Sequence, residues 1–273
     1  MKSWTSRAVD SPADPALAPY TGLTEVDLRR RWEPENGLFI AEGHLVIERS
    51  VRSHLTVESV LTAPRWLERL ESILGEWVGE VLVAEEDFLR DITGFRVHRG
   101  ALAVVRRPPL RTVTEILDLP GPVLVLEELV DATNVGLAIR SAAGLGIGQF
   151  VLSPGCADPL YRRAVKSSMG AVLSVAWARS VDWDGDLAKV AESRHLIALT
   201  PTSDGVIDEV LRGYDPERVA LLVGSEGPGV SDRALRTSTA GARIPMHGGV
   251  DSLNVAAATA VGCFALDQAR RQR

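Results

Sequence analysis

The stretch VALLVGSEGPGV, residues 219–230, decides the fold class because it joins an apolar strand to a glycine-rich loop. The run Ala220–Val223 has the continuous apolar pattern of a strand that a parallel sheet buries on both faces. Glycines in the loop after it would let backbone groups approach a ligand closely. The loop matches neither a Walker A sequence nor a dinucleotide fingerprint. A tight strand-to-helix turn, with Ser231 or Asp232 capping the next helix, is the plainer alternative, although Glu226 inside the loop favours a ligand contact.

Strands and helices alternate on both sides of this stretch. Other strands are predicted at Val123–Leu126, Phe150–Leu152, Leu196–Thr200 and Ala242–Pro245, and helices at Asn134–Leu145, Pro159–Ser168 and Leu253–Gln268. Such alternation is typical of an α/β domain with a mostly parallel sheet.

A second, smaller α/β domain is predicted before the segment Arg106-Arg107-Pro108-Pro109. Paired prolines can neither continue a helix nor occupy a central strand, so this segment is interpreted as a linker. The domains are therefore expected at residues 20–107 and 108–273. Residues 1–19 are rich in Ser, Asp, Pro and Ala, and they are expected to be a poorly ordered lead-in.

The composition narrows the class of protein. The chain has 273 residues, of which 45% are hydrophobic, and a net charge of −6, which taken alone argues mildly against binding nucleic acid. Neither a secretory signal nor an apolar run long enough to span a membrane is present. Cys156 and Cys263 lack the spacing of a metal or disulfide motif, so we expect reduced thiols, no metal site and a cytoplasmic location.

Two further stretches combine glycine with polar residues after a strand. In EELVDATNVGLAIR, residues Glu127–Arg140, the side chains of Asp131, Thr133 or Asn134 could cap a helix. In RIPMHGGVDSLN, residues Arg243–Asn254, Asp251 or Ser252 could cap the long helix that follows. Taken separately, each stretch is compatible with an ordinary capped helix.

In their order along the chain, the three stretches resemble the motifs of the SpoU/TrmH family of RNA 2′-O-ribose methyltransferases. NVGLAIR resembles N-x-G-x-x-x-R, VGSEGPGV resembles a strand followed by G-[ST]-E-G-x-G, and IPMHGGVDSLNVA resembles I-P-M-x-x-x-x-x-S-L-N-V-[AS]. The resemblance covers roughly residues 122–267. It implies a SPOUT-class domain with a deep trefoil knot, a homodimer, and an N-terminal L30e-like or L7Ae-like substrate-binding domain.

The resemblance also implies the site residues. Those implied for S-adenosylmethionine are Thr200, Gly224, Ile244 and Leu253, and those implied for catalysis are Asn134, Arg140, Glu226, Ser252 and Asn254. Arginine stays protonated, so a general-base role for Arg140 is demanding. A cationic Arg140 could instead stabilise the developing 2′-oxyanion and hold the adjacent phosphate.

The implied substrate is RNA, and the N-terminal module favours ribosomal RNA over transfer RNA. A transfer-RNA methyltransferase, a family member that binds RNA without catalysis and a small-molecule methyltransferase remain alternatives. The cluster Arg162-Arg163-Lys166 is either solvated surface or a phosphate contact. By the L7Ae-like comparison, the segments around Asn36-Gly37, Glu42-Gly43 and Arg49 would face the RNA.

Overall fold

The computed structural model describes residues 4–97 and 100–272, with the side chains of residues 26–29 outside the description. It divides into two compact units. The first unit ends at Pro108 and also takes in Leu160–Ser174, while the second comprises Pro109–Pro159 and the chain from Val175 onward. The first unit gives way to the second at the double proline, where the sequence predicted a linker. The predicted continuous domain 108–273 is wrong in one respect, because residues 160–174 pack with the first unit.

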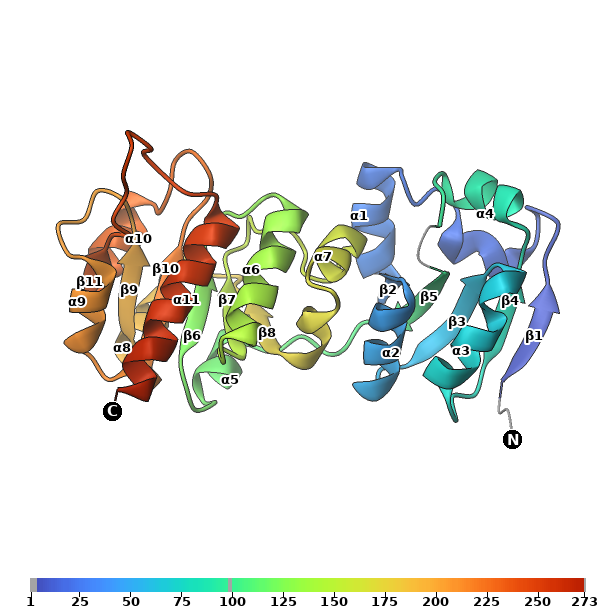
Figure 1. Ribbon diagram of the computed structural model, residues 1–273, viewed down its shortest axis with the longest axis horizontal. Coiled ribbons are helices and arrows are strands. Elements are labelled where there is room, and N and C mark those ends of the chain that lie inside the picture. Colours follow the sequence, from blue (N-terminus) through green and yellow to red (C-terminus); the bar gives the residue numbers. More distant parts are fainter. Residues whose placement is uncertain (1–3, 98–99, 273) are drawn as a thin grey trace. The chain divides into compact units, whose positions relative to one another are not determined.

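The first unit is built on a five-stranded mixed sheet with the order β1-β4-β3-β5-β2 (Figure 1). Its strands are β1 Thr5–Ala8, β2 Leu38–Glu42, β3 Val57–Thr62, β4 Glu80–Val83 and β5 Ala101–Arg106. β1, β4 and β3 run parallel, and β5 is antiparallel to both β3 and β2. Its α-helices are α1 Val26–Glu35, α2 His44–Arg52, α3 Leu67–Leu74, α4 Glu86–Thr93 and α7 Arg162–Ser167, and its 3₁₀ helices are η1 Pro15–Tyr20, η2 Pro64–Trp66 and η3 Ala171–Ser174.

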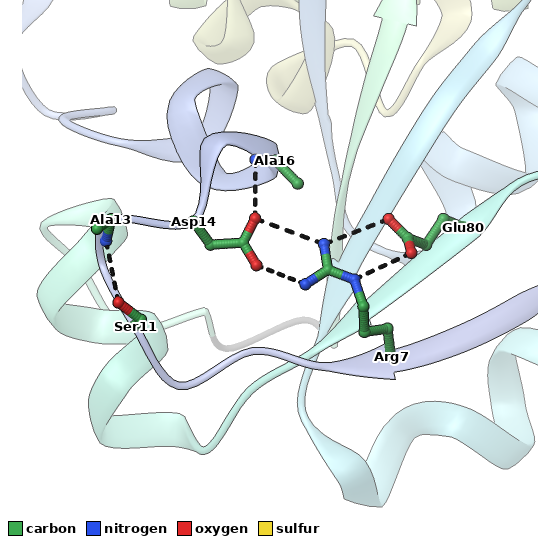
Figure 2. A network of polar contacts seen from close by, with 6 residues as sticks. All are labelled: Arg7, Ser11, Ala13, Asp14, Ala16 and Glu80. Carbon is green, nitrogen blue, oxygen red and sulfur yellow. Dashed lines mark hydrogen bonds and ion pairs between the residues drawn. The ribbon is translucent and has the colours of Figure 1, made fainter.

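The predicted disorder of residues 1–19 is wrong for the described residues 4–19. Trp4 and Leu17 are buried, and β1 pairs with β4. The Arg7 guanidinium bonds the carboxylates of Asp14 and Glu80 at 2.5 and 3.0 Å, which fastens the segment to the sheet (Figure 2). This contact lowers the pKa of the Asp14 carboxyl. Composition suggested disorder, but the few apolar side chains in the segment bury enough surface to order it.

A buried carboxylate holds α7 on the first unit's edge strand β2. The side chain of Glu42 is 3% exposed and bonds Arg162 Nη1 at 2.5 Å and Lys166 Nζ. Arg49 Nη1 donates to the carbonyl oxygen of Met169 at 2.6 Å. The expectation that Glu42 faces RNA is therefore wrong, because its carboxylate is buried inside the unit. Arg49 is partly exposed, and its contact with RNA stays a prediction. Of the predicted basic cluster, Arg163 is exposed.

The second unit contains a six-stranded sheet with the order β11-β9-β10-β6-β7-β8, and every neighbouring pair is parallel. This confirms the predicted α/β fold. Its strands are β6 Val123–Leu126, β7 Gln149–Leu152, β8 Ala176–Arg179, β9 His195–Leu199, β10 Val219–Val223 and β11 Ala240–Ala242. Its helices are α5 Val113–Leu117, α6 Ala132–Gly144, α8 Trp183–Ser193, α9 Ile207–Arg212, η4 Pro216–Arg218, α10 Asp232–Thr237 and α11 Val255–Arg271.

Helices cover both faces of this sheet, as its continuous apolar strands require. α5, α8 and α10 bury their apolar side chains on one face. On the other face α11 packs against α6, α9 and β10 (Figure 1). A Cβ at Gly262 of α11 would lie 2.6 Å from a methyl carbon of Leu199, so glycine at this position allows the helix to pack closely on the sheet. The trefoil knot stays a prediction, because strand order alone does not define how a chain threads its own loops.

Two further findings concern the predicted environment of the protein. Within the described residues, every helix is too short or too polar to span a membrane. Cys156 and Cys263 are free and buried, and burial raises the pKa of the Cys263 thiol to about 12. Both therefore stay protonated and unreactive in the folded protein at neutral pH.

We predict that Glu42→Ala lowers the free energy of unfolding by about 3 kcal/mol, because it leaves the largely buried Arg162 without its carboxylate. The control is Glu58→Ala, which removes a more exposed ion pair with Arg106. This variant should change the free energy of unfolding by less than about 1 kcal/mol. Urea denaturation of both variants measures the difference, and equal losses would show that the buried pair has no special role.

Candidate active site

The second unit has a pocket of about 650 Å³ at the carboxyl ends of β9 and β10. Ligands of α/β proteins bind at this end of a parallel sheet, and a pocket of this volume suits a nucleoside-sized molecule. Three continuous segments form most of its walls, and they comprise Leu199–Thr202, Val223–Val230 and Asp251–Val255. They include the glycine loop and the third motif identified in the sequence. Six further residues complete the lining: Asp232, Leu235, Ala242, Ile244, Met246 and Ala258.

The glycine loop after β10 is closed by its own backbone. A Cβ at Gly224 would lie 2.2 Å from the carbonyl carbon of Gly229, so only glycine fits there. The Gly229 amide donates to the Ser225 carbonyl oxygen at 3.0 Å, and Gly227 and Gly229 have φ values of +94° and +73°. Ser231 caps α10 by accepting from the Ala234 amide, as predicted. The loop is therefore a preformed turn whose backbone faces the pocket.

The third segment enters the pocket as an extended loop before α11. Asn254 caps this helix, and its Oδ1 accepts from the Ala256 amide at 2.9 Å. The predicted helix start at Leu253, with Asp251 or Ser252 as the cap, is therefore wrong. Because the helix begins at Val255, Ser252 and Leu253 are left in the loop and line the pocket.

Three polar side chains from three separate segments meet at one edge of the pocket. Asn134 Nδ2 donates to Glu226 Oε1 at 3.0 Å, and Asn254 Nδ2 donates to the same oxygen at 2.5 Å. Asn254 Nδ2 also lies 3.2 Å from Asn134 Oδ1. Asn134 is held in turn because Asp131, the cap of α6, accepts from its backbone amide. The arrangement fixes one carboxylate oxygen between two amide groups.

The charge of the pocket is negative. Its described lining includes the carboxylates of Glu226, Asp232 and Asp251 and neither lysine nor arginine. Such a lining favours a cationic ligand over a polyanion.

The structure brings together most of the predicted site residues. Thr200, Gly224, Glu226, Ile244, Ser252, Leu253 and Asn254 line the pocket, and Asn134 contacts two of them. Arg140 neither lines the pocket nor joins the polar cluster, and its side chain is exposed. Both Asn134 and Arg140 lie in α6, and six residues of helix turn them to directions about 120° apart.

Sequence reasoning missed several lining residues, among them Pro201, Thr202, Asp232 and Met246. Each comes shortly after a predicted strand or loop, so the shared carboxyl edge of the parallel strands was the available signal. It also missed Glu127, which follows β6 directly and contacts Ser231 at the end of the glycine loop.

Within the described chain, the structure contains no group of three or more His, Cys, Asp or Glu side chains suited to a metal ion. The described lining of the pocket offers amides, carboxylates, hydroxyls and the backbone of the loop.

Comparison with known proteins identifies the family. Residues 121–264 match the model of the SpoU rRNA Methylase family. The chain belongs to the SpoU rRNA methylase family. The glycine loop, the polar cluster and all six strands of the parallel sheet lie within the matched region, which ends inside α11.

Two relatives and a solved structure are similar to more than two thirds of the chain and support this assignment. An uncharacterized tRNA/rRNA methyltransferase of Mycobacterium bovis is 40% identical over 258 residues, covering 94% of this chain and 90% of the relative. A 23S rRNA (guanosine-2′-O-)-methyltransferase of Salmonella typhi is 30% identical over 202 residues, covering 71% and 79%. The AdoMet-bound rRNA methyltransferase of Sinorhizobium meliloti superimposes with a TM-score of 0.79 at 25% identity, covering 98% of both chains.

We predict that Asn254→Ala lowers the free energy of unfolding by about 1 kcal/mol more than Asn254→Ser does. Both variants lose the amide group that bonds Glu226, but serine retains an oxygen that can cap α11. Urea denaturation compares the two. Equal stability would mean that the cap contributes nothing measurable.

Proposed function

We propose that this protein transfers a methyl group from S-adenosylmethionine to a ribose 2′-hydroxyl of RNA, and that the RNA is ribosomal. The observation that carries the proposal is the meeting of Asn134, Glu226 and Asn254 at the edge of a pocket built on the glycine loop. The loop and apolar walls suit a cofactor, and the polar cluster beside them suits a hydroxyl-bearing acceptor.

The pocket residues fit S-adenosylmethionine, which the Sinorhizobium neighbour is described as binding. Backbone groups of the Gly224–Val230 loop can bond an adenosine, and Ile244 and Leu253 offer apolar contact to its base. The carboxylate lining complements the positive charge of the sulfonium. When bound, the cofactor supplies an electrophilic methyl group on positively charged sulfur.

The polar cluster would hold the acceptor ribose beside the pocket. The amide groups of Asn134 and Asn254 keep Glu226 in one orientation, which leaves a defined set of donors and acceptors for a hydroxyl. Ser252, on the adjoining loop, adds a further hydroxyl. Methyl transfer from a sulfonium mainly requires an oxygen held in line at contact distance, so positioning can supply much of the acceleration.

Arg140 would stabilise the negative charge that develops on the 2′-oxygen and hold the adjacent phosphate. Because its side chain is exposed and does not line the pocket of its own subunit, a homodimer offers a way to bring it to the pocket of a second subunit. Val261 and Phe264 of α11 are 38% and 53% exposed, which supports a subunit contact on this helix.

Ribosomal RNA is favoured because the Salmonella relative is a 23S rRNA methyltransferase and because a separate first unit precedes the catalytic one. We propose that this unit is an L30e-like module that binds the RNA, and that the enzyme works in the cytoplasm, where ribosomal RNA is modified in bacteria. Transfer RNA is the second candidate, since the Mycobacterium relative's description names both substrates.

We predict that Gly224→Ala weakens binding of S-adenosylmethionine by at least about tenfold, which is about 1.4 kcal/mol, because the added methyl group would clash with the Gly229 backbone and force the loop to shift. Gly148→Ala is the matched control, since a Cβ there meets no atom within 4 Å. Isothermal titration calorimetry measures both. Undiminished binding by Gly224→Ala would place the cofactor elsewhere.

We predict that Arg140→Ala abolishes methyl transfer and leaves the Kd for S-adenosylmethionine within about twofold of the wild type, because Arg140 does not line the pocket. Transfer of a labelled methyl group to RNA and calorimetry measure the two effects. Near-normal turnover would remove Arg140 from the mechanism.

A further inference from the structure

Glu127 is a buried carboxylate that the proposed chemistry does not use. It follows β6 directly and is 2% exposed. Its Oε1 accepts from Trp183 Nε1 at 2.9 Å and from Ser231 Oγ at 2.8 Å, and its Oε2 accepts from the Ser231 amide at 2.8 Å. All three donors are uncharged.

Burial of a carboxylate opposes folding unless hydrogen bonds replace the lost water. An apolar side chain would fill the same space without that penalty. The hydrogen bonds that the Glu127 carboxylate accepts therefore indicate its role. Two of its three bonds go to a single residue, Ser231, which is the first residue after the glycine loop.

Glu127 also contacts the other end of the loop. Its backbone amide donates to the carbonyl oxygen of Val223 at 2.9 Å, directly before Gly224. One residue thus bonds the last residue before the loop through its amide and the first residue after the loop through its carboxylate. Ser231 transmits this hold to α10, because its hydroxyl accepts from the Ala234 amide at 3.1 Å.

We propose that Glu127 is a positioning residue for the cofactor: it fixes both ends of the Gly224–Val230 loop so that the loop's backbone is ordered before the ligand binds. The inference rests on the proposed function, since it assigns the loop to S-adenosylmethionine. A preformed loop strengthens binding because less ordering entropy is lost when the ligand arrives.

The test compares two variants that each disturb the same carboxylate. Glu127→Gln keeps the shape but replaces one acceptor oxygen with an NH₂ group, which cannot accept from Ser231 or Trp183. Trp183→Phe removes only the bond to α8, a helix that does not line the described pocket. Calorimetry with S-adenosylmethionine and hydrogen exchange over residues 224–231 are measured for both, together with Tm.

For Glu127→Gln we expect the Kd for S-adenosylmethionine to rise at least about tenfold and exchange in the loop to accelerate. Trp183→Phe should leave the Kd and the exchange rate of the loop within about twofold of the wild-type values, while it lowers Tm. Wild-type affinity and exchange in Glu127→Gln, or equal weakening in the two variants, would overturn the inference. If Glu127→Gln does not fold, Ser231→Ala removes the Oγ bond to Glu127 together with the cap of α10 and should raise the Kd about threefold. An unchanged Kd would overturn the inference.

The outcome for the wild type separates this inference from the proposed function. If the wild-type protein does not bind S-adenosylmethionine, the proposed function fails. Hydrogen exchange then still decides whether Glu127 orders the loop, since that readout needs no ligand.

Discussion

The parallel pairing of β10 between β9 and β6 is the constraint on which the rest of the site depends. It puts the carboxyl ends of three strands side by side. Thr200 follows β9, the glycine loop follows β10, and Asn134 lies in α6, the helix after β6. None of these segments adjoins another in the sequence. The pocket exists because the sheet collects them, and α11 completes it by presenting Asn254 at its first turn.

Within that frame, two kinds of interaction make the site rigid. The glycine loop is shaped by backbone contacts, with Gly224 lying against Gly229 too closely for any side chain. The polar cluster is shaped by amide donors on a single carboxylate oxygen of Glu226. Both leave few groups to reorganise when a ligand binds, which is the arrangement that favours catalysis by positioning.

The features that could be predicted from the sequence were those that depend on short contiguous stretches of residues. The apolar run before Gly224 indicated a buried parallel strand, and the order of three motifs indicated the family. Features that depend on distant residues were missed. Residues 4–19 are ordered because Arg7 reaches Asp14 and Glu80, and α7 joins the first unit because Glu42 lies opposite its cations.

Helix geometry accounts for the remaining differences at the site. The first motif predicted a helix that starts at Asn134, and α6 starts two residues earlier at Ala132. Asn134 and Arg140 therefore lie about 120° apart on one helix, and Arg140 does not line the pocket. In the third motif, Asp251, Ser252 and Asn254 are all acceptable caps by residue type. In the structure Asn254 is the cap, since its Oδ1 accepts from the Ala256 amide. Its Nδ2 also bonds the distant Glu226, and a single sequence does not display that contact.

The most direct test of the central claim uses RNA from a strain that lacks the gene, because that RNA carries the unmodified target. Purified protein and S-adenosylmethionine with a labelled methyl group are added, the ribosomal and transfer RNA fractions are separated, and each is digested to nucleosides. We expect the labelled methyl group to appear in ribosomal RNA, in one 2′-O-methylnucleoside. Label on a base, or no transfer to either RNA fraction, would contradict it.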